Sequence, residues 1–156
     1  MARFTINADF DADLRKLQNI GLYIPNGCKE AVYDGAKVVA DQIHKEILAI
    51  DINDGKGKSG ITEAERNGLI AGLGVSKIKT EDGTTSAAIG FDGYNDYTTH
   101  AYPKGHANLM IARAINKGTS FRNPTKFISK AVNKSRAAAQ KAMSDCIDKY
   151  IDRMSR

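Results

Sequence analysis

The stretch LIAGLGVSKIKTEDGTTSAAIGF, residues 69–91, decides the fold class. Its first part, residues 69–79, mixes spaced apolar side chains with small and polar ones, a pattern typical of a β-strand. The dipeptide Asp82-Gly83 favours a tight hairpin turn, and residues 84–91 supply a return strand. The stretch therefore predicts a β-hairpin in the middle of the chain.

Helical periodicity flanks this hairpin on both sides. Before it, apolar side chains recur at steps of three and four over residues 32–50, in a helix that begins near Pro25. After it, residues 107–116 fit a short helix, and residues 124–154 fit a long final one. A shorter helix is expected at residues 9–20. This order predicts an α+β fold, in which long helices pack on a small antiparallel sheet built from the hairpin.

The length and composition fit a single domain over residues 1–156. The chain is 42% hydrophobic, and a domain of this size buries enough surface to need neither disulfides nor a structural metal. Cys28 and Cys146 lack metal-type spacing, so we interpret them as buried or incidental thiols. No run of about 18 apolar residues occurs, and the N-terminus does not resemble a signal peptide. We therefore expect no membrane contact and assembly in the cytoplasm.

Two polar stretches separate these elements. Residues 51–60 are rich in Gly and Lys, and residues 91–106 have a turn-forming composition, so we expect both to be flexible or interface loops. Between them, Thr62 and Glu65 have capping-box spacing and predict a helical turn that ends near Gly68.

Residues 91–106 carry four aromatic side chains of interest: Phe91, Tyr94, Tyr97 and Tyr102. Such rings stack on single-stranded bases, pack on their own domain or lie against another subunit. Base-stacking surfaces normally include interleaved Lys or Arg, whereas this stretch has two Asp residues and no basic residue before Lys104. We therefore expect packing or a protein interface.

The positive charge belongs to the C-terminal part of the chain. The net charge is +5, with ten basic and three acidic residues from Lys117 onward, so that residues 117–156 carry +7 and the first 116 carry −2. Four lysines at steps of four, four and seven predict a basic face on the last helix: Lys126, Lys130, Lys134 and Lys141. This face is a solvated surface or a contact for DNA or an acidic partner.

No catalytic, cofactor or metal site is predicted. Residues 55–59 look like part of a phosphate-binding loop, but Ile52 occupies the position of the first required Gly. His100 and His106 lie six residues apart without Cys or carboxylate partners at ligand spacing, which is a weak zinc signal. These two histidines are the only candidates for an unrecognised enzyme site.

The order of the elements carries a family resemblance. Residues 31–140 contain the following elements in order: a long amphipathic helix, a hairpin, a short helix that ends in Gly118-Thr119, and a Pro and a Phe before the last helix. The clearest piece is IARAINKGTSFRNPTKFISKAV, residues 111–132. Together they resemble the tail-completion, or head-tail joining, proteins of long-tailed bacteriophages. Phe127 matches the family's aromatic residue, whereas Pro124 stands three residues before it and not beside it.

The resemblance implies a non-enzymatic virion protein of the phage neck or tail end. Such proteins form a ring, most often a hexamer, between the capsid connector or adaptor and the tail-tube or tail-terminator proteins. DNA passes through the ring, and the ring is assembled in the host cytoplasm. Two alternatives stay open: a small basic DNA-binding protein that uses the last helix, and a small enzyme with an unrecognised site.

Overall fold

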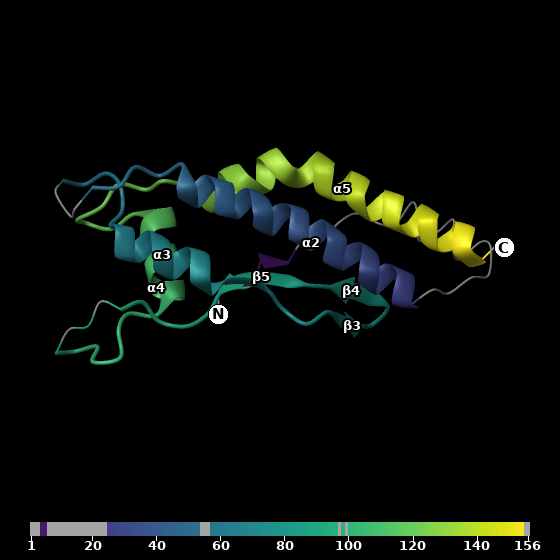
Figure 1. The fold of residues 1–156 in the computed structure, drawn as a ribbon, viewed down its shortest axis with the longest axis horizontal. Helices are drawn as coiled ribbons and strands as arrows, with labels where there is room; N and C mark the ends of the chain where they lie inside the picture. Colours follow the sequence, from purple (N-terminus) through teal and green to yellow (C-terminus); the bar gives the residue numbers. More distant parts are fainter. Residues whose placement is uncertain (1–3, 6–24, 54–56, 97, 99, 155–156) are drawn as a thin grey trace.

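Two long helices run side by side and antiparallel along the molecule. The structure, a computed structural model, describes residues 4–5, 25–53, 57–96, 98 and 100–154. Helix α2 (Pro25–Leu48) and helix α5 (Phe127–Met154) form this pair, and α5 starts beside the end of α2 (Figure 1). Both helices were predicted, whereas the helix expected at residues 9–20 lies outside the described residues.

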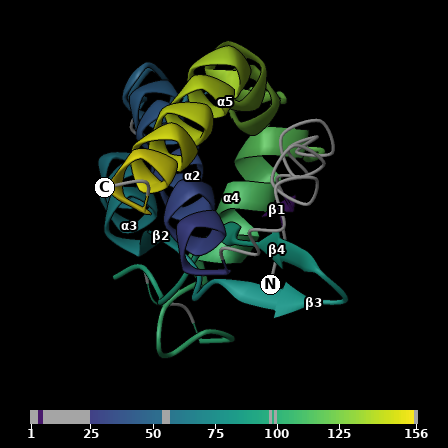
Figure 2. The same cartoon turned by 90° about the vertical axis from the view of Figure 1, so that its right-hand side faces the viewer.

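Helix α2 has two buried faces. The predicted apolar stripe packs on the sheet, and Figure 2 shows α2 between α5 and the strands. A second stripe of small residues, Gly27, Ala31 and Gly35, is also buried. A Cβ added at Gly35 would lie 2.6 Å from Cγ and Sδ of Met143. Small side chains therefore let α2 and α5 approach closely.

The predicted hairpin forms the sheet. Strand β5 (Ala88–Phe91) pairs antiparallel with β1 (Phe4–Thr5) on one side and with β2 (Leu73–Val75) on the other. Strands β3 (Lys79–Glu81) and β4 (Thr84–Ser86) pair at the tip of the same hairpin. Asp82 and Gly83 have φ of 52° and 77°, as a two-residue turn with two left-handed positions requires.

The two ladders of the hairpin are separated by a β-bulge. Val75 faces Ile89 and Lys79 faces Ser86, so three residues on one strand lie opposite two on the other. The N–H of Ser76 still donates to the carbonyl of Ala88 at 2.7 Å. One extra residue bends a hairpin and increases its twist. The tip therefore leaves the plane of the three-stranded sheet.

Helix α3 (Glu63–Gly72) begins with the predicted capping box but ends later than predicted. The N–H of Glu65 donates to Oγ1 of Thr62 at 3.2 Å, and the N–H of Thr62 donates to Oε2 of Glu65 at 2.9 Å. The prediction of a helix end near Gly68 and a strand from Leu69 was wrong. Leu69 is fully buried as part of the helix, and Gly68 leaves room for Asn108, whose Oδ1 would lie 2.8 Å from a Cβ.

Helix α4 (Asn108–Lys117) covers the remaining side of the core, close to its predicted bounds. The rings of Phe91 and Phe127 meet edge to face with centroids 6.3 Å apart, which joins the sheet to the start of α5. A separate, smaller cluster of Ala31, Met143 and Ile147 lies between α2 and α5. The predicted α+β fold with long helices on a small antiparallel sheet is thus confirmed.

The sequence predicted no membrane contact. Over the residues that the structure describes, no helix is both long enough and apolar enough to span a bilayer.

Candidate interaction surfaces

The Gly-Thr pair of the family resemblance forms a tight loop after α4. The N–H of Gly118 donates to the carbonyl of Ala114 at 2.9 Å, and Gly118 has φ of 78° and ψ of 170°. Thr119 and Arg122 exchange backbone hydrogen bonds of 2.9 and 3.2 Å. A Cβ at Gly118 would lie 2.9 Å from the Arg122 carbonyl oxygen and from Cδ of Pro124. Glycine is therefore required both for the backbone angles and for space.

Asn116 holds the start of α5. Its Oδ1 accepts from the N–H of Ile128 at 3.1 Å, and its carbonyl accepts from the N–H of Lys126 at 3.1 Å. A side-chain oxygen thus satisfies one of the free N–H groups of the first turn. Phe127 is 1% exposed, as expected for an anchor of this helix. The sequence did not reveal this capping role of Asn116, because Asn116 lies twelve residues before the N–H group of Ile128 that it caps.

Long-range bonds fix the loop between α4 and α5 to other parts of the chain. Arg122 forms an ion pair with Glu65 of α3, with Nη2 2.8 Å from Oε1 and 3.0 Å from Oε2. The N–H of Asn123 donates to the carbonyl of Lys58 at 2.7 Å, and its Nδ2 lies 3.2 Å from Oγ of Ser59. The loop therefore has a defined shape despite its exposure.

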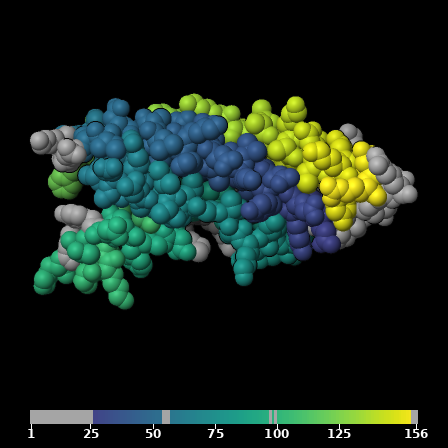
Figure 3. All heavy atoms as spheres, viewed as in Figure 1, coloured from purple at the N-terminus to yellow at the C-terminus, as the bar shows by residue number. Residues whose placement is uncertain are grey.

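Several loops gather at one end of the molecule, which we call the loop end: residues 49–53, 57–62, 92–96, 98, 100–107 and 118–126. In the space-filling view this end divides into two lobes (Figure 3). Large apolar side chains are exposed here, above all Phe121, which is 83% exposed. Ile52 in the loop end and Leu48 at the adjoining end of α2 are also exposed. An apolar surface on braced loops is typical of a contact with another protein.

The predicted aromatic loop is only partly a loop. Phe91 belongs to β5 and is 8% exposed, so its assignment to an interface loop was wrong: its side chain alternates inward and packs on Phe127. Tyr94 is 64% exposed, whereas Tyr102 packs against His106 with ring centroids 4.4 Å apart. Tyr97 lies outside the described residues. The interface prediction is untested and now concerns Tyr94 and Tyr102.

The ends of this loop are tied together by Asn95. The N–H of Asn95 donates to the carbonyl of His106 at 3.0 Å, and its Oδ1 accepts from the N–H of His106 at 2.9 Å. Asn95 is buried although it lies in a polar loop. This anchor carries no signal in the sequence, since the partner lies eleven residues away.

Three of the four predicted lysines lie exposed on α5. Lys130, Lys134 and Lys141 belong to the helix, but Lys126 precedes it with φ of 54°. The prediction of a four-lysine helical face was wrong for Lys126, because α5 begins at Phe127. Nζ of Lys134 lies 2.7 Å from Oε1 of the buried Glu46 on α2.

The ion pair between α2 and α5 changes the acidity of Glu46. The hydrogen bond from Lys134 lowers the pKa of the Glu46 carboxyl, although burial acts in the opposite direction. Nε2 of Gln42 donates to the same carboxylate at 3.0 Å, and the charge of Lys130 also lowers its pKa. Glu46 therefore stays ionised at neutral pH and offsets part of the positive charge of this face.

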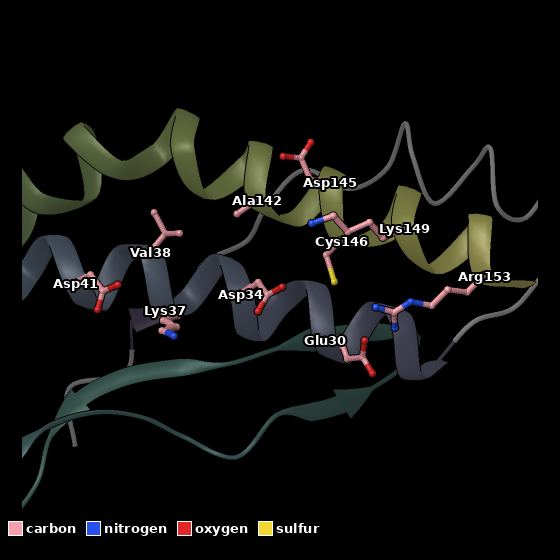
Figure 4. Close-up of a pocket in the computed structure, with 10 residues that line it drawn as sticks. All are labelled: Glu30, Asp34, Lys37, Val38, Asp41, Ala142, Asp145, Cys146, Lys149 and Arg153. Atoms are coloured by element: carbon pink, nitrogen blue, oxygen red, sulfur yellow. The ribbon is translucent and has the colours of Figure 1, made fainter.

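A charged groove of about 550 Å³ lies between the first half of α2 and the second half of α5 (Figure 4). Burial raises the pKa of the Cys146 thiol, and a hydrogen bond with Asp34 raises it further. Burial also raises the pKa of Cys28. Both thiols are therefore protonated at neutral pH, and both residues are half-buried. The groove is lined by charges of both signs: Glu30, Asp34, Lys37, Asp41, Asp145, Lys149 and Arg153.

The structure describes both of the predicted histidines, and among residues 100–154 it records no contact between the two. His100 is exposed, and His106 packs against Tyr102 and is tied to Asn95. Among the described residues, no group of three or more His, Cys, Asp or Glu side chains could hold a metal ion.

Comparison with family models, curated proteins and solved structures found no significant match to this chain.

Proposed function

We propose that this chain is a structural subunit of a bacteriophage neck or tail end. It forms a ring, most often a hexamer, that docks the tail to the capsid connector around the DNA path. Its partners are copies of itself, the connector or adaptor, and the tail-tube or tail-terminator proteins. The proposal places the chain in the virion, after assembly in the host cytoplasm, and assigns it no catalytic step and no cofactor.

The observation that carries this proposal is the exposed apolar surface on the braced loop end. Phe121 projects from a loop that is closed by the Thr119–Arg122 backbone bonds and held by Glu65. A loop that already has its bound shape loses little conformational entropy on association. Burial of one large aromatic side chain contributes about 2–3 kcal/mol. Phe121 is therefore suited to anchor a contact between subunits or with a neighbouring ring.

The resemblance in element order supports the same proposal. The long helix, the hairpin, the short helix, the Gly-Thr pair and the last helix occur in the order that the resemblance implies. In this chain the Gly118-Thr119 pair closes α4 and shapes the loop that exposes Phe121. The motif thus has a structural role, which fits a protein that acts by shape and charge complementarity.

DNA contact is the second candidate function, because Lys130, Lys134 and Lys141 are exposed on α5. Two observations weaken it: Glu46 binds Lys134, and Asp145 follows on the same side of the helix. A DNA-binding protein would bind a duplex at low salt and lose affinity steeply as the salt concentration rises. Absence of binding at low salt would remove this candidate.

Electron microscopy and phage genetics test the proposal. The purified chain, alone or with its connector or tail-tube protein, should form rings, and particles that lack it should have separate heads and tails. Normally joined virions from a deletion strain would refute the proposal.

A variant pair tests the role of the loop end. Phe121→Ser should reduce ring formation or head-tail joining while it leaves the fold intact. Tyr33→Ser is the matched control, since Tyr33 is an exposed aromatic residue on α2 outside the loop end. Equal joining by the two variants would contradict the role of Phe121.

A further inference from the structure

The segment from α4 to the middle of α5 carries positive charge without an acidic residue of its own. Between Asp96 and Asp145 the sequence has nine basic residues and no Asp or Glu. The structure records ion pairs for two of the nine, Arg122 with Glu65 and Lys134 with Glu46. Within the described part of the chain, the other seven form no ion pair: Lys104, Arg113, Lys117, Lys126, Lys130, Arg136 and Lys141.

Four of these seven residues lie where α4 leads into α5, and we call them the basic corner: Arg113, Lys117, Lys126 and Lys130, all of them exposed. Arg113 and Lys117 lie one turn apart on the side of α4 that faces away from its buried residues. The N–H of Lys126 donates to the carbonyl of Asn116 at 3.1 Å, which places Lys126 beside the end of α4. The N–H of Lys130 donates to the carbonyl of Lys126 at 3.0 Å. The corner thus gathers cations from two helices and the loop between them.

Lys126 is an unfavourable residue for its position. Its φ of 54° is a left-handed conformation that residues other than Gly, Asn and Asp rarely adopt. The other non-glycine residue with positive φ among the described residues is Asp82, which belongs to a tolerant type and lies in the hairpin turn. The first turn of α5 also has no acidic residue, so Lys126 and Lys130 stand unopposed at the positive end of the helix dipole. Natural sequences accept such combinations mainly where the side chain has a function.

The side chains around the basic corner are typical of a contact with nucleic-acid phosphates. The exposed neighbours in the loop and in the first turn of α5 include Thr119, Ser120, Asn123 and Ser129. Hydroxyl and amide side chains of these types, together with Arg and Lys, make most protein contacts to phosphate oxygens. A protein interface is instead depleted in Lys and Ser and enriched in large aromatic side chains. The loop carries one such side chain, Phe121, which the proposed function assigns to a protein contact.

We propose that the basic corner binds the phosphate backbone of duplex DNA without reading its sequence. Cations that neutralise phosphates release counterions from the duplex, and this release drives the association. The inference deepens the proposed function, on which it rests for the presence of DNA beside the chain. It assigns the contact to the corner and not to the middle of α5, where Glu46 and Asp145 offset the positive charge.

Fluorescence anisotropy of a labelled duplex of arbitrary sequence, titrated with the full chain at several salt concentrations, tests the contact. With four phosphates neutralised, the logarithm of the binding constant should fall against the logarithm of the salt concentration with a slope of about −3.6. The double variant Lys117→Gln with Lys126→Gln should lower the magnitude of this slope by about 1.8 and bind at least about tenfold more weakly at low salt. Lys77→Gln with Lys79→Gln on the hairpin is the control, since it makes the same change in net charge at two exposed positions.

Lys126→Gly separates the charge of the corner from the stability of the fold. Glycine adopts a φ of 54° without strain, so this variant should unfold at an equal or higher urea concentration than the original chain. Its salt slope should nevertheless fall in magnitude by about 0.9, because one phosphate contact is lost. A residue with a purely structural role would not lose binding while the fold gains stability.

Several outcomes would overturn the inference. These are no binding of the duplex at low salt, a corner variant that binds as tightly as the control, and an unchanged slope for Lys126→Gly. Tighter binding of polyglutamate than of the duplex would assign the corner to an acidic protein. Loss of binding only in the variant Arg136→Gln with Lys141→Gln would assign the DNA contact to the middle of α5. Rings that do not bind DNA would refute this inference alone, whereas a chain that binds DNA without ring formation or head-tail joining would refute only the proposed function.

Discussion

Substitution of Gly118 by Ala should be among the most damaging single-methyl changes in this chain. Gly118 has φ of 78° and ψ of 170°, a region that only glycine adopts readily. The new Cβ would also lie 2.9 Å from the Arg122 carbonyl oxygen and from the Pro124 ring. Neither is the end of a flexible side chain, and Arg122 is further held by Glu65. The backbone therefore has to move.

The expected cost follows from two contributions. The backbone conformation costs about 1–3 kcal/mol for a residue with a side chain. The steric overlap costs about 1–3 kcal/mol, as other overpacked sites do. Alanine also restricts the unfolded chain, which offsets about 0.4–1 kcal/mol. We therefore expect Gly118→Ala to lower the free energy of unfolding by about 1–5.5 kcal/mol, with a midpoint of about 3 kcal/mol.

Two other glycines separate these contributions. Gly83 has φ of 77° but open space around a Cβ, so Gly83→Ala should cost only the backbone strain, about 1–2 kcal/mol. Gly74 has open space without a positive φ, so Gly74→Ala should change stability by less than about 1 kcal/mol. Urea unfolding followed by circular dichroism measures all three. A Gly118→Ala protein as stable as Gly74→Ala would refute the reasoning.

Three further predictions concern the helices. Phe127→Ala should lower the free energy of unfolding by about 3–5 kcal/mol, because Phe127 is buried. Phe121→Ala should lower it by less than about 0.5 kcal/mol, because Phe121 is exposed. The urea midpoints of the two variants measure this difference. Thr62→Ala should cost about 1 kcal/mol by removing the cap of α3, measured in the same way. The pKa of Glu46 is lower in the folded chain than in the unfolded chain. The ionised Glu46 therefore contributes its full stabilisation above the pKa of the unfolded chain, and this stabilisation is lost as the pH falls through the pKa of the folded chain. Glu46→Gln should therefore reduce stability at pH 7 by about 0.5–1 kcal/mol and have little effect in acid, as urea unfolding at both pH values would show.

Features determined by neighbouring residues were predictable from the sequence. The Asp82-Gly83 turn, the Thr62–Glu65 capping box and the apolar stripe of α2 each depend on residues within one or two turns. The order of the helices and the hairpin followed from the same local patterns, and with it the fold class.

Features that depend on distant contacts were not predictable. Helix α3 continues past Gly68, and the missing side chain of Gly68 leaves the space in which Asn108 packs, forty residues later. Phe91 was assigned to a loop because its partner Phe127 lies in another element. Gly35 belongs to the stripe of small residues on α2, and its role depends on Met143 of α5, which packs against it.

The interaction surfaces were predicted least well. The lysine spacing drew attention to α5, but Lys126 lies before the helix and Lys134 binds Glu46. Phe121 was not singled out, because a lone aromatic residue in a polar loop has the same pattern whether it is buried or exposed. The bonds of Arg122 and Asn123 to distant residues show that this loop is held in place.

The separate cluster of Ala31, Met143 and Ile147 gives the helix pair two regions of unequal stability. Near the loop end, α2 and α5 share the large core with the sheet and α4, whereas these three side chains form their own small core. Amide hydrogens of α5 beyond Met143 should therefore exchange with solvent through local opening, well before those near Ala131. We therefore expect the far half of the helix pair to open as its own cooperative unit while the remainder stays folded.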